Sequence, residues 1–597
     1  MANGFGSMFI GVAGLQSSQN ALNVTSNNLA NLDTTGYVRQ SVLFADRDYV
    51  TFNTTAAISN QQSGLGVTIG DVVHSRDVFL DRLYRTESSR QSFYASTSEA
   101  LTEVQNYYQE LEGQAFQNAL TDFWGSFQEL YKYPEDSVYQ NLVVQKAQLF
   151  TSRSSAVYSG LKSYQYNINS QISDDIDQVN ELGKTISELN LQIQKIEAGN
   201  IETAMTLRDA RDLALDELAS LVDISYKEEV NGVVRVSVEG NEFVNENGYY
   251  KVEKQTDKVT GFVTPYWSHL SDPDKGEYTY LFNFNRDIST ENKNDMGEIK
   301  ALVLARGDKV ANYKDILGVD GKTYDDTTGM SVMLRAEAQM DQLFHGIATA
   351  INDILCPNTE ASNYITGLTG NNSVTMTDAD GNTYTVTANT KILDADKCAV
   401  GSDGKLPPQE LFTRLGTERY TEVTYTDTSV NPPTTKTYYL YNEEDPTDTT
   451  KQYTMASTGV NSALITDETL LPHLQQNGDV DQSLMATLAA VWDKESLTVN
   501  PNDTKAYSFK GYYTAMIEEV ATYGNVYNST ATNLSQTVQS VDNQRQQVIG
   551  VSSDEELTSM IQFQNAYMIK YQNAYNPSSR FINVINEMIE HLITQLG

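Results

Sequence analysis

Apolar side chains recur every three or four residues over the first part of the chain, which predicts one apolar stripe along a helix. The stripe consists of Phe5, Met8, Val12, Leu15, Leu22 and Leu29. Serine, glutamine and asparagine fill most other positions, and residues 1–32 contain no lysine, arginine, aspartate or glutamate. A helix that faces water normally carries charge on its polar side. The neutral polar face therefore favours a helix surrounded by other helices.

The C-terminal part of the chain carries a second apolar stripe, whose seven-residue steps split into four and three. Its members are Leu557, Ile561, Met568, Tyr571, Tyr575, Ile582, Ile585, Ile589, Leu592 and Leu596. This spacing is typical of a coiled-coil helix, and the N-terminal helix is the expected partner. Two features complicate it. Residues 560–567 recur with two changes as residues 568–575, and Pro577 should kink the helix axis.

Helical periodicity also dominates residues 86–222. Pro134 divides this region, because proline lacks the amide hydrogen that a helix interior uses. The clearest periodic row consists of Ile168, Ile172, Ile176, Val179, Leu182, Ile186, Leu189, Ile193 and Ile196, and it is typical of a coiled-coil seam. Upstream, residues 64–85 are predicted to form a short strand that leads into a helix.

Beyond Asp223 apolar and polar residues alternate, which predicts strands. The Asn-Gly pairs at 231–232 and 247–248 indicate hairpin turns, and we expect strands to continue over residues 278–284. A helix is predicted for residues 331–355. These observations place a first β-rich block in the middle of the chain.

A second β-rich block is predicted over residues 356–458. Within it, residues 373–387 and 422–441 each alternate on both sides of a turn sequence. Helical periodicity resumes near Ser483 and continues to the end of the chain. Because the helices lie at both ends of the sequence, they must pack on each other to bury their apolar stripes.

The expected fold is an α+β multidomain protein with a discontinuous, coiled-coil-like helical stalk built from both termini and with β-rich middle domains. The expected divisions are 1-40 with 550-597 for the terminal coiled-coil region, 41-222 with 331-355 and 480-549 for the helical stalk domain, 223-330 for a β-rich domain, and 356-479 for a β-rich inserted domain.

The charge balance excludes some classes of partner. The net charge of the 597-residue chain is −37, and binding to nucleic acid or to an anionic membrane surface depends on lysine and arginine. No apolar stretch approaches the ~20 residues that span a bilayer. The uncharged N-terminus also lacks the positive segment of a secretory signal. We therefore expect no nucleic-acid partner, no membrane insertion, and export without a cleaved signal peptide.

The sequence does not predict a catalytic, cofactor or metal site. The five histidines are scattered, and the common hydrolase, metalloprotease and phosphate-loop motifs are absent from the sequence. Residues 272–276 resemble the start of a calcium loop, but position twelve would be Asn283, so a turn is expected. Cys356 and Cys398 lack metal-ligand spacing and are expected to be free thiols, although an oxidising compartment would permit a disulfide.

The segment from Ala21 to Tyr37, which contains Asn-Asn-Leu-Ala-Asn-Leu-Asp-Thr-Thr-Gly-Tyr, resembles the N-terminal signature of flagellar rod, hook and hook-associated proteins. Within this axial family the chain is most similar to the hook-associated proteins of the hook–filament junction. The segments that carry this resemblance are Gly64–Arg85, Asp209–Leu218 with Asp223-Ile224 and Asn231-Gly232, Arg545 with Gly550–Glu556, and Phe563–Tyr567 with Ser578–Phe581.

The resemblance implies a structural role without enzymatic activity. Such proteins leave the cell through the flagellar type III export apparatus and join the hook to the filament outside the cell. The implied partners are other copies in a ring or helical assembly, the hook protein, a second junction protein, filament subunits, and an export chaperone at the C-terminal helix. Alternatives are a hook or distal rod protein, or an axial protein with an enzymatic or adhesive insert. The tandem repeat and Pro577 depart from the family pattern.

Terminal helices of this family pair in the innermost layer of the tube, which implies an assembly interface at both ends of the chain. The expected interface residues are Leu15, Leu22, Asn27, Asn28, Leu29, Ala30, Asn31, Thr35, Gly36, Tyr37, Phe563, Tyr567, Tyr571, Ile582, Ile585, Ile589 and Leu592.

Overall fold

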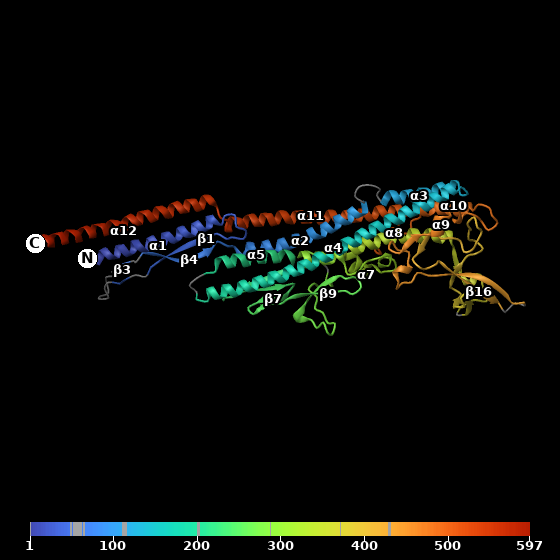
Figure 1. Ribbon diagram of the computed structural model, residues 1–597, viewed down its shortest axis with the longest axis horizontal. Helices are drawn as coiled ribbons and strands as arrows, with labels where there is room; N and C mark the ends of the chain where they lie inside the picture. The colour runs from blue at the N-terminus through green and yellow to red at the C-terminus, as the bar shows by residue number, and fades with distance from the viewer. Residues whose placement is uncertain are drawn as a thin grey trace.

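The helices of the computed structural model run along one long axis, and both chain termini lie at the same end (Figure 1). The structure describes residues 2–47, 50–51, 62–63, 66–109, 116–199, 203–286, 288–370, 372–427 and 432–596. Helices at both ends of the sequence and strands in its middle confirm the expected α+β multidomain class. Within the described residues, no helix combines the length and the apolar character that crossing a membrane requires.

The helical part pairs segments from opposite ends of the sequence. Its helices are α1 (Ala2–Ala30), α2 (Val78–Gln109), α3 (Phe116–Lys132), α4 (Ser137–Glu197), α5 (Met205–Leu221), α6 (Glu298–Arg306), α7 (Gly321–Asp326), α8 (Val332–Leu355), α9 (Ser462–Thr466), α10 (Gln482–Ala490), α11 (Phe509–Ile549) and α12 (Ser553–Leu596). Helix α1 packs against α12, and α2 packs against α11. The prediction that the two helical ends pair is thus confirmed.

Two prolines act differently on the helices. Pro134 lies in the break between α3 and α4, as predicted, and Asp136 then caps α4 by accepting a hydrogen bond from the Val138 amide at 2.9 Å. By contrast, α12 continues without interruption from Ser553 to Leu596, so the helix does not end at Pro577.

The first β-rich block lies on α4. Strands β5 (Ile224–Glu228), β6 (Val234–Val238), β7 (Asn241–Asn245) and β8 (Gly248–Tyr249) form an antiparallel sheet in that order, and β9 (Val252–Thr256) pairs with β10 (Val263–Trp267). Both predicted Asn-Gly turns connect neighbouring strands of this sheet. The prediction of strands over residues 278–284 is wrong. That segment is irregular apart from one bridge between Tyr280 and Tyr266, where Trp267 donates to the Thr279 carbonyl and Leu281 donates to the Pro265 carbonyl, each at 2.9 Å.

The predicted seam of α4 is buried over most of its length, but it does not meet one long partner helix. It packs against α5, α6 and the strands β7 to β10. Two asparagines of α4 bind the sheet through its backbone. Asn180 accepts from the Val252 amide at 2.9 Å and donates to its carbonyl at 2.8 Å, and Asn190 contacts Val234 in the same way. The seam therefore holds the β-rich block on the stalk.

Replacing Gly183 with alanine is expected to lower the free energy of unfolding by about 1–3 kcal/mol, because it overpacks this contact. The new methyl carbon would lie 2.3 Å from Cζ of the buried Phe243. In α3, the same substitution at Gly125 meets nothing within 4 Å and should stabilise the helix by about 0.5–1 kcal/mol. Thermal unfolding of both variants tests this, and shifts of the same sign would contradict it.

The second β-rich block contains a six-stranded sheet with the order β11-β14-β17-β16-β12-β13. Its strands are β11 (Asn358–Glu360), β12 (Ser373–Thr377), β13 (Thr383–Thr387), β14 (Lys391–Leu393), β16 (Tyr420–Asp427) and β17 (Thr434–Tyr441), and a separate pair joins β15 (Phe412–Arg414) to β18 (Thr458–Val460). Both predicted hairpins are confirmed. Cys356 and Cys398 are buried and free, and residues 272–276 form the expected turn.

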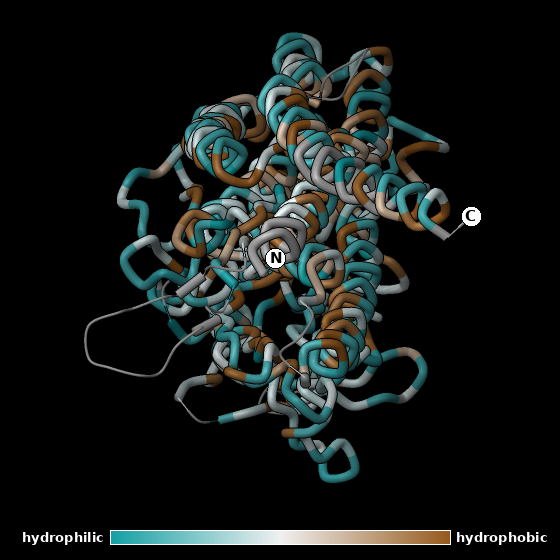
Figure 2. Tube along the Cα trace, turned by 90° about the vertical axis from the view of Figure 1, so that its left-hand side faces the viewer, coloured by the Kyte–Doolittle hydropathy of each residue, from teal (hydrophilic) through white to brown (hydrophobic). Residues whose placement is uncertain are grey.

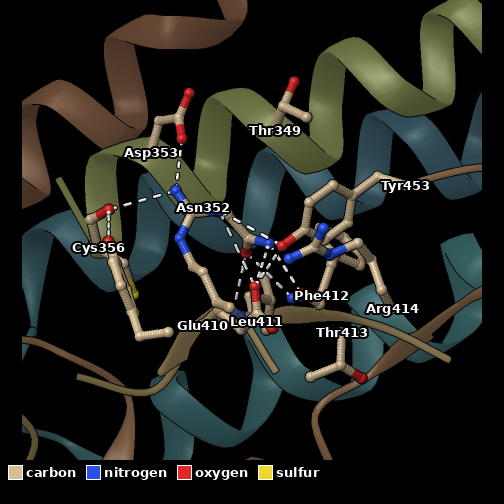
Figure 3. A network of polar contacts seen from close by, with 12 residues as sticks. Thr349, Asn352, Asp353, Cys356, Glu410, Leu411, Phe412, Thr413, Arg414 and Tyr453 are labelled. Atoms are coloured by element: carbon tan, nitrogen blue, oxygen red, sulfur yellow. Dashed lines mark hydrogen bonds and ion pairs between the residues drawn. The ribbon is translucent and has the colours of Figure 1, made fainter. Parts of the chain in front are cut away.

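A buried polar network attaches this block to α8 (Figure 3). The Asn352 side chain donates to Glu410 Oε2 at 3.0 Å and to the Phe412 carbonyl at 2.8 Å, and its oxygen accepts from the Leu411 and Phe412 amides. Tyr453 donates to the same carboxyl oxygen at 2.6 Å. Burial raises the pKa of Glu410 to about 7. The amide oxygen and the amide nitrogen of Asn352 each make two hydrogen bonds to the block, so this side chain positions the block on α8.

Candidate assembly site

The terminal helix pair joins the stalk at a compact junction, which we call the knuckle. It consists of residues 28–40, 74–85, 209–216 and 545–556. Strand β1 (Gln40–Asp46) runs away from the knuckle, and β4 (Val67–His74), which is antiparallel to β1, runs back to it. The short strands β2 (Val50–Thr51) and β3 (Gln62–Ser63) form a second antiparallel pair. We call these four strands the arm. The knuckle thus brings together most of the segments that carried the family resemblance.

Asn28 is the centre of the knuckle and is 1% exposed. Its amide nitrogen donates to the Gln40 carbonyl at 2.9 Å and to Glu556 Oε2 at 3.2 Å. Its oxygen accepts from the Tyr37 hydroxyl at 2.8 Å and from the Gln40 amide at 3.1 Å. One side chain therefore fixes the end of α1, the start of β1 and the start of α12. An asparagine suits this position because it both donates and accepts.

The loop after α1 is built from local hydrogen bonds and one glycine turn. Asn31 donates to the Asn27 carbonyl at 2.9 Å, and Thr34 donates to Asn31 at 3.2 Å. Gly36 has φ +79°, a conformation that favours glycine, and an added Cβ would lie 3.3 Å from the Leu213 side chain on α5. The signature sequence is therefore explained by a close approach of the loop to α5.

Arginines and aspartates alternate through the stalk side of the knuckle. Arg76 pairs with Asp81 and Asp212, Arg85 pairs with Asp212 and Asp216, and Arg545 pairs with Asp81 and Asp216. These side chains come from the start of α2, from α5 and from the end of α11. The cluster therefore links three helices that are far apart in the sequence.

We did not predict the members of this cluster as site residues. The three aspartates Asp209, Asp212 and Asp216 recur at three- and four-residue spacing, which places them on one face of α5. That spacing was a usable signal. Their arginine partners lie more than 100 residues away in the sequence, so the sequence alone did not pair them.

Asp209 binds the arm on the other side of the cluster. Its Oδ2 accepts from the Val38 amide at 3.2 Å, and its Oδ1 lies 3.5 Å from His74 Nδ1. Burial raises the pKa of the Asp209 carboxyl to about 7, and burial with nearby Arg76 lowers the pKa of His74 to about 4. Between these values the contact joins a neutral carboxyl group to a neutral imidazole, so it is not an ion pair there.

Asp209→Asn is expected to gain stability relative to the natural chain as the pH rises from 4 to 8. The folded state holds the Asp209 proton up to about pH 7, whereas an unfolded aspartate loses it near pH ~3.9. The folded state binds more protons over that window, so the contribution of Asp209 to stability is lost as the pH rises. Asparagine keeps the acceptor for Val38 without this loss.

Urea unfolding at several pH values measures the difference between the two chains. Asp33→Asn, at an exposed carboxyl group of the neighbouring loop, controls for the removal of one negative charge. A difference between natural chain and Asp209→Asn that does not change with pH would contradict the assignment.

The prediction that α1 and α12 bury their apolar stripes against each other is wrong for α12, whose stripe residues Leu557, Ile561 and Met568 are exposed, whereas Leu15, Leu22 and Leu29 of α1 are half-buried. Over residues 10–30, where side-chain burial is described, the buried residues of α1 are Ala13, Gly14, Ser17, Ser18, Ala21, Thr25 and Asn28. Small side chains let the helices approach closely, and Lys570 of α12 donates to the Gly14 carbonyl at 3.3 Å and to Ser18 Oγ at 3.2 Å. Within the tandem repeat, Phe563 contacts Phe44 of β1 with ring centroids 6.2 Å apart.

The apolar stripes stay largely at the surface of the single chain. In Figure 2, which faces the end with the termini, brown and teal positions alternate around the helix that ends at the C-terminus. Exposed apolar residues of α12 include Leu557, Ile561, Met568, Tyr571, Ile589 and Leu592. Of α1, Ile10 and Val12 are exposed. Exposed apolar side chains that recur along one helix favour an interaction surface there.

The predicted interface residues fall into groups by exposure. Asn28 is buried. The half-buried members are Leu15, Leu22, Leu29, Asn31, Gly36, Tyr37, Phe563 and Tyr567, and the exposed members are Asn27, Ala30, Thr35, Tyr571, Ile589 and Leu592. The side chains of Ile582 and Ile585 lie outside the described residues. The predicted residues that belong to the knuckle are Asn28, Leu29, Ala30, Asn31, Thr35, Gly36 and Tyr37.

Known proteins resemble this chain over nearly its whole length. Residues 8–37 match the family of flagella basal body rod proteins, and residues 101–367 match the helical domain of flagellar hook-associated protein FlgK. Flagellar hook-associated protein 1 of Bacillus subtilis is 24% identical over 595 residues, which cover 98% of this chain and 96% of that protein. The protein of the same name from Salmonella typhimurium is 22% identical over 596 residues, which cover 96% and 98%.

A solved structure is also similar. The flagellar hook junction protein FlgK from Burkholderia pseudomallei aligns with 79% of this chain and 100% of its own, at 14% identity and a TM-score of 0.46. The sequence matches and the paired terminal helices define a flagellar axial protein. Within that class, the sequence is similar to flagellar hook-associated protein 1 over nearly its whole length, and the chain is a component of the bacterial flagellum.

Proposed function

We propose that this chain is the structural protein that joins hook to filament and allows the filament to assemble. The observation that supports this most directly is the match to hook-associated protein 1 along nearly the full chain. The geometry agrees, because the family signature forms the knuckle from which the terminal pair extends with its apolar stripes exposed. Such a surface requires neighbours, and a tubular assembly supplies them.

We further propose that the terminal pair, with residues 1-40 and 550-597, is the assembly region. The stalk (41-222, 331-355 and 480-549) and the β-rich blocks (223-330 and 356-479) would then lie outside it as separate units. This division is supported by the elongated shape and by the packing of α1 on α12 and of α2 on α11 (Figure 1). The predicted interface residues of α1 and α12 would contact other copies, the hook protein, the second junction protein and filament subunits.

The role we propose is structural and not enzymatic. Its supports are the resemblance to structural flagellar proteins and the structural partners of the buried polar groups in Figure 3. We also propose export outside the cell by the type III apparatus without a cleaved signal peptide. An export chaperone would cover the stripe of α12 until assembly, since residues of that stripe such as Leu557, Ile561 and Leu592 are exposed in the single chain.

Deletion of the gene in its host tests the junction role. Electron microscopy of the cells and immunoblotting of the medium for filament protein are the two measurements. Hooks without filaments, together with filament protein in the medium, are expected, and a plasmid copy of the natural gene should restore filaments. Absent hooks would instead place the protein in the hook or distal rod. Normal filaments would overturn a junction role altogether.

A further inference from the structure

The first turn of α2 presents an apolar knob next to the knuckle. Phe79 is 71% exposed and Val78 is 58% exposed. Asp77 fixes this turn, because its side chain accepts from the Phe79 amide at 2.8 Å. Arg82 is exposed one turn further on. We call Val78, Phe79 and Arg82 the knob.

The knob is held rigidly, which a binding surface needs. Asp81, between Phe79 and Arg82 in the sequence, is buried and pairs with Arg76 at 2.8 Å and with Arg545 at 3.1 Å. The knob is therefore fixed by the ion-pair cluster of the knuckle. A helix turn whose backbone is already held in place loses little conformational entropy when a partner covers the apolar side chain that the turn presents.

A cleft of about 920 Å³ opens on another side of the knuckle. Leu32 of the loop after α1, Leu213 of α5, and Tyr84 and Ser88 of α2 line it. Leu32 is 41% exposed. The lining of the cleft carries five carboxyl groups and two guanidinium groups. The carboxyl groups are Asp33, Asp216, Glu217, Asp542 and Glu555, and the guanidinium groups are Arg39 and Arg545. The knuckle cleft is therefore apolar at Leu32 and Leu213 and negative around them.

Knob and cleft both adjoin the knuckle but lie on opposite sides of α2. The Ser75 amide donates to the Arg39 carbonyl at 3.0 Å, which sets the start of α2 beside the end of the signature loop. Phe79 and the cleft residue Ser88 are nine positions apart, which at ~100° per residue places them about 180° apart on the helix. Two different surfaces on opposite sides of one junction can form a head-to-tail contact that repeats around an axis.

We propose that the knob of one copy of this chain inserts into the knuckle cleft of the next copy around the flagellar axis. Phe79 and Val78 would cover Leu32 and Leu213, and Arg82 would face the carboxyl groups of the rim. Charge complementarity argues for a second copy as the occupant, because the knob brings a cation to a negative cleft in a chain with a net charge of −37. This inference rests on the proposed function, since it requires an axial assembly.

Cysteine crosslinking in assembled flagella tests the contact. The variant carries Leu32→Cys and Phe79→Cys, both at exposed positions, and replaces the natural gene in its host. Mild oxidation of isolated flagella is expected to give covalent dimers and larger oligomers, because the two thiols come from different copies. Each single variant should stay monomeric, which also controls for the buried Cys356 and Cys398.

The outcomes separate the two proposals. Flagella that contain the double variant but yield only monomer after oxidation would overturn the knob-in-cleft contact and leave the junction role intact. Failure to find the natural, tagged chain between hook and filament would overturn the proposed function itself.

A charge exchange gives a second test. Arg82→Glu is expected to reduce incorporation into flagella, and adding Glu217→Lys to it should restore incorporation, because every cleft then carries a cation opposite the new carboxylate. Arg286→Glu, at an exposed arginine outside the knob and the cleft lining, is the matched control and should incorporate normally. No rescue by the second substitution would contradict the pairing of knob and cleft.

Discussion

Replacement of Arg545 by methionine is expected to lower the free energy of unfolding of the stalk by about 3–5 kcal/mol. The Arg545 side chain, at the end of α11, is nearly buried. It pairs with Asp81 of α2 at 3.1 Å and with Asp216 of α5. Its guanidinium also lies 4.6 Å from the ring centroid of Tyr84. Methionine keeps most of the packing volume but leaves two aspartates in a buried site without this cation.

Urea unfolding followed by circular dichroism measures the effect. Lys146→Met is the matched control, because Lys146 pairs with Asp122 at 2.7 Å on the surface of the stalk. Loss of such an exposed pair changes stability by about 0–1 kcal/mol. Equal effects of the two substitutions would show that the knuckle cluster contributes no more than a surface pair.

Asn28→Leu is expected to detach the terminal pair from the stalk. Leucine has a similar volume but can neither donate nor accept, so Glu556, Tyr37 and the backbone of Gln40 lose a buried partner. Each buried group left without a hydrogen bond costs about 1–3 kcal/mol. The expected loss is therefore several times the contribution of a single hydrogen bond.

Amide hydrogen exchange of β1 and of the first turns of α12 reports on this detachment. Exchange there should accelerate strongly in Asn28→Leu, while exchange in the β-rich blocks stays unchanged. Asn27→Leu makes the same chemical change at an exposed position one residue earlier. If both variants exchange at the same rate, Asn28 is not the residue that holds the pair in place.

Sequence periodicity located most elements because their apolar faces are buried within the chain itself. The predicted helix 331–355 matches α8 (Val332–Leu355), and four hairpins follow turn sequences. The segment 278–284 alternates like a strand, but its pairing with β10 is limited to the bridge between Tyr280 and Tyr266. Periodicity records where apolar side chains recur and does not say which surface covers them.

The terminal pair shows the same limit. Its heptad stripes predicted helices correctly, yet the chain itself buries the small-residue face of α1. Sequence reasoning predicted only part of the knuckle. Asn28 and Gly36 stood in a recognisable signature, whereas the pairs of Arg76, Arg85 and Arg545 join segments that only folding brings together.

The contact between Asn28 and Glu556 spans 528 positions of the sequence, which sets an order for folding. Loop-closure entropy and high contact order make such long-range pairings slow to form. A chain threaded through a narrow channel, whichever end leads, holds one partner of this contact back until almost its entire length has emerged. Under the export proposed above, the knuckle would therefore form last, after both ends of the chain have left the channel.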